Sequence, residues 1–414
     1  QETGNRKQET GNRKQETGEV RSMIYLDNAA TTRTAPEVVE AMLPYFTENY
    51  GNPSALYSLG ATGKKAVNEA RRRIAGVIGA KQEEIYFTSG GTEADNWALK
   101  AAAEGSAYKG RHIITTRIEH HAILNTCKYL EKRGFEVTYL DVDAYGRIDL
   151  AQLEGAVRPD TILISVMFAN NEIGTLEPIG EIGRLARKKG IMFHTDAVQA
   201  FGQLPIQVDE LGVDLLSASA HKLNGPKGIG MLYVRSGVKM GSFLHGGEQE
   251  RNRRAGTENV PGIVGFGAAA ARAMDKMVQK AAVERELRDY LIGRIEAEIP
   301  YCRLNGHREQ RLPGNVNFSF SFIEGESLLI MLDMKGICAS SGSACASGSL
   351  NPSHVLLATG LKQEEAHGSL RMTLSEENTR EEMDIVVEEL KQAVARLRNM
   401  SPLYEDFIKS TQES

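Results

Sequence analysis

The chain has 414 residues, of which 41% are hydrophobic and 25% are charged, as in an ordinary globular protein. Its formal net charge of −5 offers no basic excess for nucleic acid, and no apolar run approaches the about 18 residues of a membrane span. We therefore expect neither a nucleic-acid nor a membrane partner, and no cleavable leader predicts secretion. The four cysteines form no Cys-x-x-Cys pair and are too few for a disulfide scaffold, which favours a reducing, cytoplasmic compartment.

Residues 1–22 stand apart, because they contain the heptapeptide QETGNRK twice and begin it a third time. This segment is polar and can bury no apolar surface, so we expect it to be disordered and tag-like. Without it the chain keeps 44 basic and 50 acidic residues, a net charge of −6, so the segment does not distort the charge argument.

Short apolar runs alternate with amphipathic ones over the next 200 residues or so. The runs predict buried strands within residues 84–90, 112–116, 135–143, 161–170, 191–199, 214–222 and 228–235. Helical patterns lie between most of them, for example at 121–134 and at 179–190, which ends on a glycine. This alternation predicts an α/β fold, with a mostly parallel sheet covered by helices on both faces.

The pattern changes after Gly256, where a long helical stretch (262–299) is followed by shorter strand-like runs and a last helix at 380–400. This order predicts a smaller α+β domain behind the large one. We expect the large domain at 32–275, the small domain at 23–31 and 276–400, and a tail at 401–414.

Two charged residues are expected at the carboxyl ends of strands, where ligands bind in open α/β sheets. Lys222 follows an apolar strand and precedes a turn rich in glycine and proline, a setting in which an amine can become a nucleophile. Asp196 ends another strand and could hold a protonated ring nitrogen of a cofactor. A surface lysine and a helix N-cap aspartate fit the same patterns.

The segment Ser89–Thr92 (SGGT) lies between a predicted strand and a predicted helix. Uncapped amides and the helix dipole at such a turn favour an anion such as phosphate. Short glycine turns are common, and this one has neither the Walker nor the dinucleotide spacing.

Three further positions carry side chains suited to a polar site. His120 and His121 begin a helix, where one of them could stack on a cofactor or move protons, although a capped surface histidine fits as well. Asn171 lies in NNEIG, which is either a pair of amides at a strand end or a turn. Arg371 follows a glycine in a strand and could clamp a carboxylate, or be a surface charge. No metal-ligand spacing occurs.

Cys345 differs from the other cysteines, because every other residue from Ala339 to Ser349 is alanine, serine or glycine. Such a loop is mobile and solvated, which suits a thiol that carries sulfur between two places, although an incidental loop cysteine is the alternative. Cys127 and Cys302 look structural, and a buried role is expected for Cys338.

Taken together, the chain resembles the cysteine desulfurases of the NifS/IscS type, which are pyridoxal phosphate enzymes of fold type I, the aspartate aminotransferase fold. The resemblance extends from Tyr25 to about Met400. Nine motifs carry it in order: GNPSALYSLG, FTSGGTEADN, EHHAIL, NNEIG, HTDAVQ, SASAHKLNGPKGIG, RRAGTENV, SSGSACASGS and GSLR.

The resemblance implies a role for each candidate residue. Lys222 would bind pyridoxal phosphate covalently, Asp196 would pair with its ring nitrogen, and His120 would stack on its ring and act as an acid or base. The other cofactor contacts would come from Asn171 and Gln199 at the ring oxygen, and from Gly91, Thr92, Ser219, His221 and, across a homodimer interface, Thr257 at the phosphate. Asn171 and Arg371 would bind the substrate carboxylate, and Cys345 would be the nucleophile.

The resemblance also implies a reaction, in which L-cysteine becomes L-alanine while its sulfur is carried as a persulfide on Cys345. A sulfur-acceptor protein such as an iron–sulfur scaffold would then receive it. A selenocysteine lyase or a transaminase of the same fold remains an alternative, as does a non-catalytic sulfur-assembly partner. Cys338 departs from the family pattern, which usually has a small residue such as alanine at its position.

Overall fold

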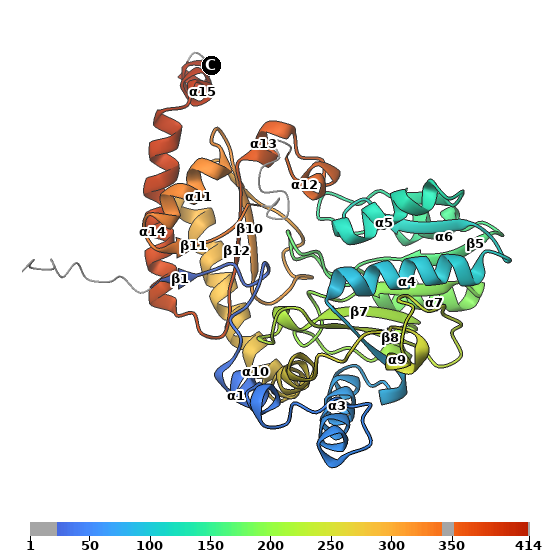
Figure 1. The fold of residues 1–414 in the computed structure, drawn as a ribbon. Helices are drawn as coiled ribbons and strands as arrows, with labels where there is room; N and C mark the ends of the chain where they lie inside the picture. The colour runs from blue at the N-terminus through green and yellow to red at the C-terminus, as the bar shows by residue number, and fades with distance from the viewer. Residues whose placement is uncertain (1–22, 342–351, 413–414) are drawn as a thin grey trace, which may run out of the picture.

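The computed structural model describes residues 23–341 and 352–412. Its larger part is built on one seven-stranded sheet (Figure 1). The strands are β2 (Ile85–Thr88), β3 (His112–Thr116), β4 (Glu136–Leu140), β5 (Thr161–Ser165), β6 (Met192–Asp196), β7 (Leu215–Ser219) and β8 (Gly230–Val234). Their order is β2-β8-β7-β6-β5-β3-β4; β8 runs antiparallel to both of its neighbours, β2 and β7, and the other adjacent strands pair in parallel. The predicted α/β fold with a mostly parallel sheet is confirmed, and each strand lies within a segment predicted to contain one.

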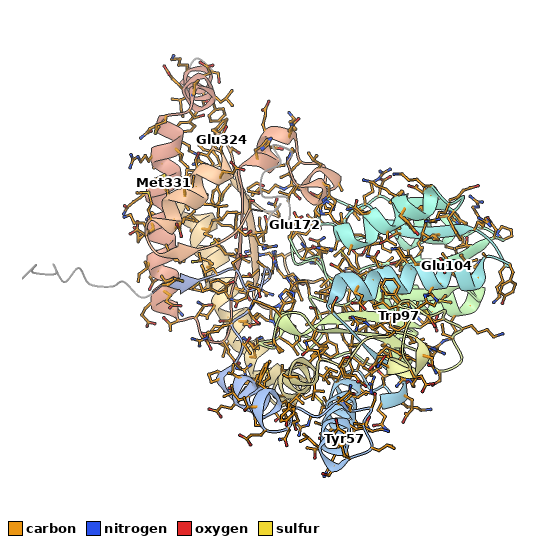
Figure 2. The ribbon with its side chains drawn as sticks, viewed as in Figure 1. Tyr57, Trp97, Glu104, Glu172, Glu324 and Met331 are labelled. Carbon is orange, nitrogen blue, oxygen red and sulfur yellow. The ribbon has the colours of Figure 1, made fainter. Side chains whose placement is uncertain are left out.

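Helices cover both faces of this sheet. The helices of the larger part that precede α10 are α1 (Pro36–Met42), α2 (Pro44–Thr47), α3 (Ser58–Val77), α4 (Gly91–Ser106), α5 (His121–Glu131), α6 (Leu150–Ala156), α7 (Ile179–Lys189), α8 (Val208–Leu211) and α9 (Gln249–Asn252), with 3-10 turns η1 (Gln82–Glu84) and η2 (Ala220–Lys222). Successive strand residues point to opposite faces. Ile113 packs in the cluster of α4 and α5, whereas Ile114 packs in that of α3 and α7. Trp97 of α4 is fully buried in the first cluster (Figure 2).

The smaller part contains an antiparallel sheet of order β12-β10-β9 and a parallel pair, β1 with β11. Its elements are β1 (Ile24–Tyr25), β9 (Cys302–Leu304), β10 (Asn315–Phe320), β11 (Ile337–Cys338), β12 (Ser369–Thr373), α11 (Gly325–Asp333), α12 (His354–Ala358), α13 (Gln363–His367) and α14 (Arg380–Asn399). Helix α10 (Val260–Glu298) joins the two parts, because Ala273 packs in the core of the larger part and Leu287 in that of the smaller one.

The segment expected to be a tail contains helix α15 (Pro402–Gln412). Two aromatic side chains, Tyr404 and Phe407, anchor it. The ring of Phe407 lies 5.1 Å from that of Tyr301 and 4.8 Å from that of Phe322, measured between centroids. Aromatic residues three positions apart share one face of a helix, so this short stretch gains its order from tertiary packing. Across the described residues, no helix is both long and apolar enough to cross a membrane.

Candidate active site

A cavity of about 470 Å³ opens at the carboxyl ends of the parallel strands, where the larger part meets the smaller one. It is lined by Ala29, Ala30, Gly91, Thr92, Asp95, His120, Met167, Ala169, Asn171, Asp196, Val198, Gln199, Ser219, His221, Lys222 and Arg371. Parallel α/β sheets bind their ligands at this edge, because loops and helix N-termini converge there. The cavity is therefore the candidate active site.

Ten of the residues singled out in the sequence line this one cavity, although they lie up to 280 positions apart. They are Gly91, Thr92, His120, Asn171, Asp196, Gln199, Ser219, His221, Lys222 and Arg371. Thr257 does not line it and is exposed between α9 and α10. Cys345 lies outside the described residues.

Lys222 is the lysine that lines the cavity. It belongs to the 3-10 turn η2, which directly follows β7, so the strand fixes where its stem begins. Its Nζ atom donates a hydrogen bond to the carbonyl oxygen of Ala30 at 2.8 Å and another to that of Ala29. The half-buried amine is thus aimed at the cavity wall formed by the segment that follows β1.

Asp196 is a buried carboxylate at the end of β6, where the backbone N–H of Val198 donates to its Oδ1 atom at 2.9 Å. Burial raises the pKa of Asp196, while the neighbouring His120 and Lys222 oppose that rise. His120 caps α5, since its Nδ1 atom accepts a hydrogen bond from the N–H of Ala122 at 3.1 Å. Burial lowers the pKa of His120, so the ring is neutral near pH 7.

The N-terminus of α4 forms an anion cradle at another side of the cavity. No side chain caps this 16-residue helix, so its first amides and its dipole are available to an anion. A Cβ atom on Gly91 would lie 2.6 Å from Cγ2 of Val198, so only glycine fits there. Thr92, Ser219 and His221 add polar groups. Burial lowers the pKa of His221 to about 4, which keeps its ring neutral.

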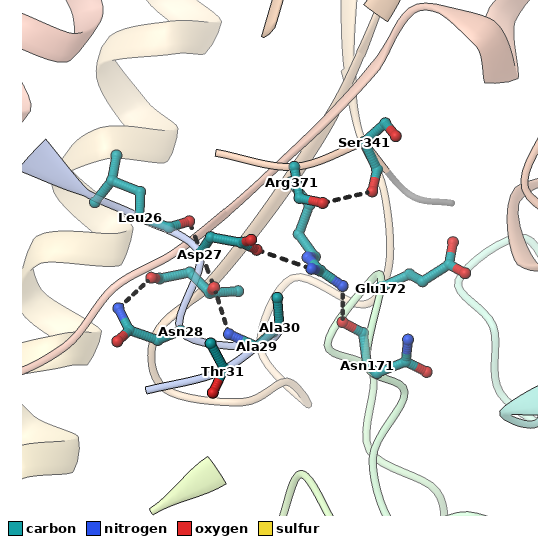
Figure 3. A network of polar contacts seen from close by, with 12 residues as sticks. Leu26, Asp27, Asn28, Ala29, Ala30, Thr31, Asn171, Glu172, Ser341 and Arg371 are labelled. Carbon is teal, nitrogen blue, oxygen red and sulfur yellow. Dashed lines mark hydrogen bonds and ion pairs between the residues drawn. The ribbon is translucent and has the colours of Figure 1, made fainter. Parts of the chain in front are cut away.

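Arg371 reaches the cavity from β12 of the smaller part (Figure 3). Its Nη2 atom pairs with Oδ1 of Asp27 at 2.9 Å, and its Nη1 atom donates to the carbonyl oxygen of Asn171 at 3.1 Å. The side chain is 3% exposed, and its buried Nε atom has no hydrogen-bond partner among the described residues. A buried guanidinium with a donor to spare is suited to bind a carboxylate.

Glu172 shows how the turn next to Asn171 is held between the two parts (Figure 2). Its carbonyl oxygen accepts hydrogen bonds from the side-chain amides of Asn315 and Asn317 in β10, at 3.2 and 3.0 Å. Its carboxyl group is buried and contacts the hydroxyl of Ser353, the N-cap of α12. These contacts fix the position of Asn171.

The described cysteines lie away from the cavity. Cys127 is buried in α5, and burial raises its pKa. Cys302 and Cys338 are half-buried in β9 and β11, and burial raises their pKa values too. All three are free thiols that are poor nucleophiles in these settings. No group of three metal-ligating side chains occurs within residues 23–341 and 352–412.

Six cavity residues were not predicted: Ala29, Ala30, Asp95, Met167, Ala169 and Val198. Five of them are apolar, and nothing in their local pattern distinguishes them from core residues. Asp95 carried a signal, because an aspartate three positions after Thr92 falls on the same side of the helix, near the predicted anion site. Asp27, which pairs with Arg371, gave no such signal.

The residues present fit pyridoxal phosphate, because an amine, a buried carboxylate and an anion cradle surround one cavity. Residues 24–386 match the family model for class-V aminotransferases. Cysteine desulfurase IscS from Clostridium botulinum is 56% identical over 396 residues (95% of this chain and 100% of the relative), and that from Methanosarcina thermophila is 58% identical over 380 residues (92% and 94%).

Solved structures agree in fold. A NifS-like protein aligns with a TM-score of 0.85 at 39% identity, over 91% of this chain and all of that one. SspA in complex with cysteine aligns with a TM-score of 0.75 at 38% identity, over 85% of this chain and 98% of that one. The chain therefore belongs to the class-V aminotransferase family and, within it, to the cysteine desulfurases of the IscS/NifS type, which are pyridoxal phosphate enzymes.

Proposed function

We propose that this desulfurase converts L-cysteine to L-alanine and carries the sulfur as a persulfide on Cys345. The observation that carries the proposal is the single cavity that gathers Lys222, Asp196 and Arg371. These three side chains supply an amine, an acceptor for a protonated ring nitrogen, and a binding group for a carboxylate. An amino acid bound to pyridoxal phosphate needs all three.

The residues around the cavity would bind and orient the cofactor. Lys222 would hold it covalently, Asp196 would accept a hydrogen bond from its ring nitrogen, and the neutral ring of His120 would lie against its ring. Asn171 and Gln199 would contact the ring oxygen. Gly91, Thr92, Ser219 and His221 would surround the phosphate at the N-terminus of α4. When bound, pyridoxal phosphate draws electrons from the substrate Cα and so makes the C–S bond labile.

The substrate is positioned by groups from both parts of the chain. Arg371 and Asn171 would bind its carboxylate and so hold the Cα–H bond within reach of Lys222. The amine of Lys222 would accept the Cα proton as a neutral base, and His120 would assist proton transfer. Burial keeps His120 neutral, and because its Nδ1 atom accepts the N–H of Ala122, the proton of the neutral ring is on Nε2, from which it could be donated.

The sulfur step is a displacement at the substrate sulfur. The Cys345 thiolate forms an S–S bond with that sulfur while the Cβ–S bond breaks, and the electron pair of the broken bond stays with the carbon fragment. Cβ then takes up a proton, and L-alanine leaves. Cys345 lies outside the described residues, so its support is the composition of its segment and the family match.

We infer that the active enzyme is a homodimer in which Thr257 of one subunit approaches the phosphate of the other. Thr257 is exposed and lies outside its own cavity. Large apolar side chains, Leu43, Phe46, Leu56 and Tyr57, are exposed near the N-terminal helices, which is typical of a covered interface. Sedimentation velocity would detect the dimer. We propose a cytoplasmic location and a sulfur-acceptor protein such as an iron–sulfur scaffold as the partner.

Mass spectrometry of the protein after addition of L-cysteine tests the proposal. We expect the peptide that contains Cys345 to gain about 32 Da, the mass of one sulfur atom. Cys345→Ala should keep the visible absorption of the bound cofactor and lose alanine formation, whereas Lys222→Ala should lose the covalent cofactor. Cys338→Ala is the matched control and should behave as wild type. Unchanged alanine formation in Cys345→Ala would show that the thiol is not the sulfur carrier.

A further inference from the structure

The segment 249–257, which ends at Thr257, is held in a backbone conformation that a free peptide rarely adopts. Residues 250–252 have φ angles of 45°, 57° and 63°, and none of them is glycine. Three successive residues in this left-handed region persist only where their surroundings hold them. The N–H of Gly256 donates to Oε1 of Gln249 at 3.1 Å, so the segment also closes on itself. The contacts of the segment therefore determine where Thr257 lies.

Glu250 is the first anchor of this segment, and it lies against β2, the end strand of the seven-stranded sheet. Its carboxylate accepts two hydrogen bonds from the buried Arg71, at 2.7 and 2.8 Å, and one from the N–H of Phe87 at 3.0 Å. Arg71 and Arg251 both donate to the carbonyl oxygen of Ile85. These side chains thus occupy backbone groups of an open sheet edge and fix the start of the segment there.

Arg254 is the second anchor, three positions before Thr257. Its Nε and Nη2 atoms donate to the two carboxylate oxygens of Glu93 at 2.8 and 3.0 Å, which makes a bidentate ion pair. The side chains of Arg254 and Glu93 are only 22% and 12% exposed, so the pair is largely shielded from solvent. Although burial raises the pKa of Glu93, hydrogen bonds from Arg254 and Ser89 outweigh that effect and lower the pKa. Glu93 is therefore an anion at neutral pH.

Glu93 also belongs to the anion cradle of the candidate active site. It lies in the first turn of α4, directly after Thr92, which lines the cavity. Its Oε2 atom accepts the N–H of Ser89 at 2.8 Å, so it holds the turn that leads into the helix. One carboxylate thus joins the cradle of this subunit to segment 249–257, whose Thr257 lies outside the same cavity.

We propose that Glu93 and Arg254 are positioning residues that connect the two cofactor sites of the dimer. Within one subunit their ion pair fixes segment 249–257 against α4, and so places Thr257 for the phosphate site of the partner subunit. This inference rests on the proposed dimer and on the proposed role of Thr257. Neither Glu93 nor Arg254 is among the described residues that line the cavity, so both act through Thr257. Because the pair forms within one chain, Thr257 is placed before the subunits meet, which lowers the cost of ordering it.

The proposal predicts that breaking the pair in one subunit affects the cofactor of the other. Arg254→Lys keeps the positive charge but loses the planar fork that binds both oxygens of Glu93. Segment 249–257 then loses its fixed position, and Thr257 contacts the phosphate of the partner subunit less often. The partner's cofactor should bind more weakly, whereas the cofactor of the altered subunit keeps its own Thr257 contact from the unaltered chain.

Mixed dimers test this assignment. Two differently tagged chains are co-expressed and the mixed dimer is purified through both tags, with Lys222→Ala in one chain so that only the other chain binds the cofactor covalently. Pyridoxal phosphate is titrated into the apoprotein, and the visible absorption of the lysine-bound cofactor gives the dissociation constant of that site. Arg254→Lys in the Lys222→Ala chain should raise this constant at least about threefold, and in the chain with intact Lys222 less than about twofold. Sedimentation velocity checks that each protein is dimeric.

Three further variants, each placed in the Lys222→Ala chain, complete the experiment. Thr257→Ala should raise the dissociation constant about tenfold or more, since a hydrogen bond to a charged group is lost. Glu93→Gln breaks the same ion pair but keeps an acceptor for Ser89, so it should repeat the effect of Arg254→Lys. Arg253→Lys is the matched control and should have no effect, because the guanidinium of Arg253 lies over the ring of Tyr86.

The outcomes separate the two levels of the argument. If Thr257→Ala weakens the partner's cofactor but Arg254→Lys and Glu93→Gln do not, the proposed role of Thr257 stands and the positioning role of the pair is wrong. An effect of Arg254→Lys that is equal in both placements, or confined to its own subunit, would overturn the positioning role as well. If Thr257→Ala leaves the partner's cofactor unaffected, the proposed role of Thr257 fails, and the positioning role fails with it.

Discussion

Replacing Arg371 by lysine tests whether its guanidinium binds the substrate carboxylate. The buried guanidinium already contacts Asp27 and the carbonyl oxygen of Asn171, and it retains an unpartnered Nε atom. Lysine keeps the positive charge but has one nitrogen, so it cannot make these contacts and a bidentate carboxylate pair together. The variant therefore isolates hydrogen-bond geometry from charge.

The expected loss follows from one charge-assisted hydrogen bond, which contributes about 1.5–3 kcal/mol. At about 1.4 kcal/mol per tenfold change, kcat/KM for L-cysteine should fall about 10- to 150-fold. Because the charge that balances Asp27 remains, the fold should be retained. Steady-state measurement of alanine formation gives kcat and KM, and the visible absorption of the bound cofactor checks that Arg371→Lys is fully loaded.

Arg311→Lys is the matched control. Arg311 is equally buried and donates to the carbonyl oxygen of Ile173 and to Oδ1 of Asn315, at 3.0 and 2.9 Å, but it does not line the cavity. It should change kcat/KM less than about threefold, which is well below the expected effect of Arg371→Lys. Equal losses in the two variants would refute a direct contact between Arg371 and the substrate.

Two further predictions concern buried carboxyl groups outside the cavity. Glu250→Gln should lower the free energy of unfolding, measured by urea titration, by about 3–5 kcal/mol, because it leaves Arg71 buried without its bidentate partner. Glu69→Gln on the surface of α3 is the control and should lower it by at most about 1 kcal/mol, so equal effects would contradict the burial argument. Burial raises the pKa of Glu177 to about 8, so between pH 5 and pH 8 this carboxyl group ionises only in the unfolded chain. The free energy of unfolding of wild type should therefore fall by about 1.4 kcal/mol per pH unit relative to that of Glu177→Gln over this range. A constant difference between the two proteins would mean that the folded carboxyl group is already charged.

The strands of the larger part could be predicted because they are short, apolar and bounded by turn residues. Residues 112–116, for example, form β3 over the whole predicted segment. The insertion of β8 between β2 and β7 could not be predicted, because strand order depends on contacts that no local pattern records. Helix α15 was missed for a related reason, since it depends on Tyr301 and Phe322, about 80 to 100 residues earlier.

The candidate site was more predictable than the strand order, since its residues lie at strand ends and helix starts, which topology brings to one edge of the sheet. The sequence could not predict which residues from different elements meet at the cavity or behind it. Asp95 of α4 and Asp196 of β6 line the same cavity from a helix and a strand, and Asp27 reaches Arg371 from a segment 344 positions away. Each pair depends on which faces meet, and that is decided by packing.

Contacts of this kind explain why both the larger and the smaller part of the chain contribute to the substrate end of the cavity. Asn171 belongs to the larger part, and Glu172 beside it is bonded through its carbonyl oxygen to Asn317 of β10 in the smaller part. In the register of the small sheet, Asn317 pairs with Arg371, whose guanidinium returns to the carbonyl oxygen of Asn171. These contacts link the larger part and the smaller part in a closed chain of interactions. A change in how the two parts pack would therefore move the carboxylate-binding group relative to Lys222, so loss of the Asn317 amide that bonds Glu172 should affect KM for L-cysteine before it affects cofactor binding.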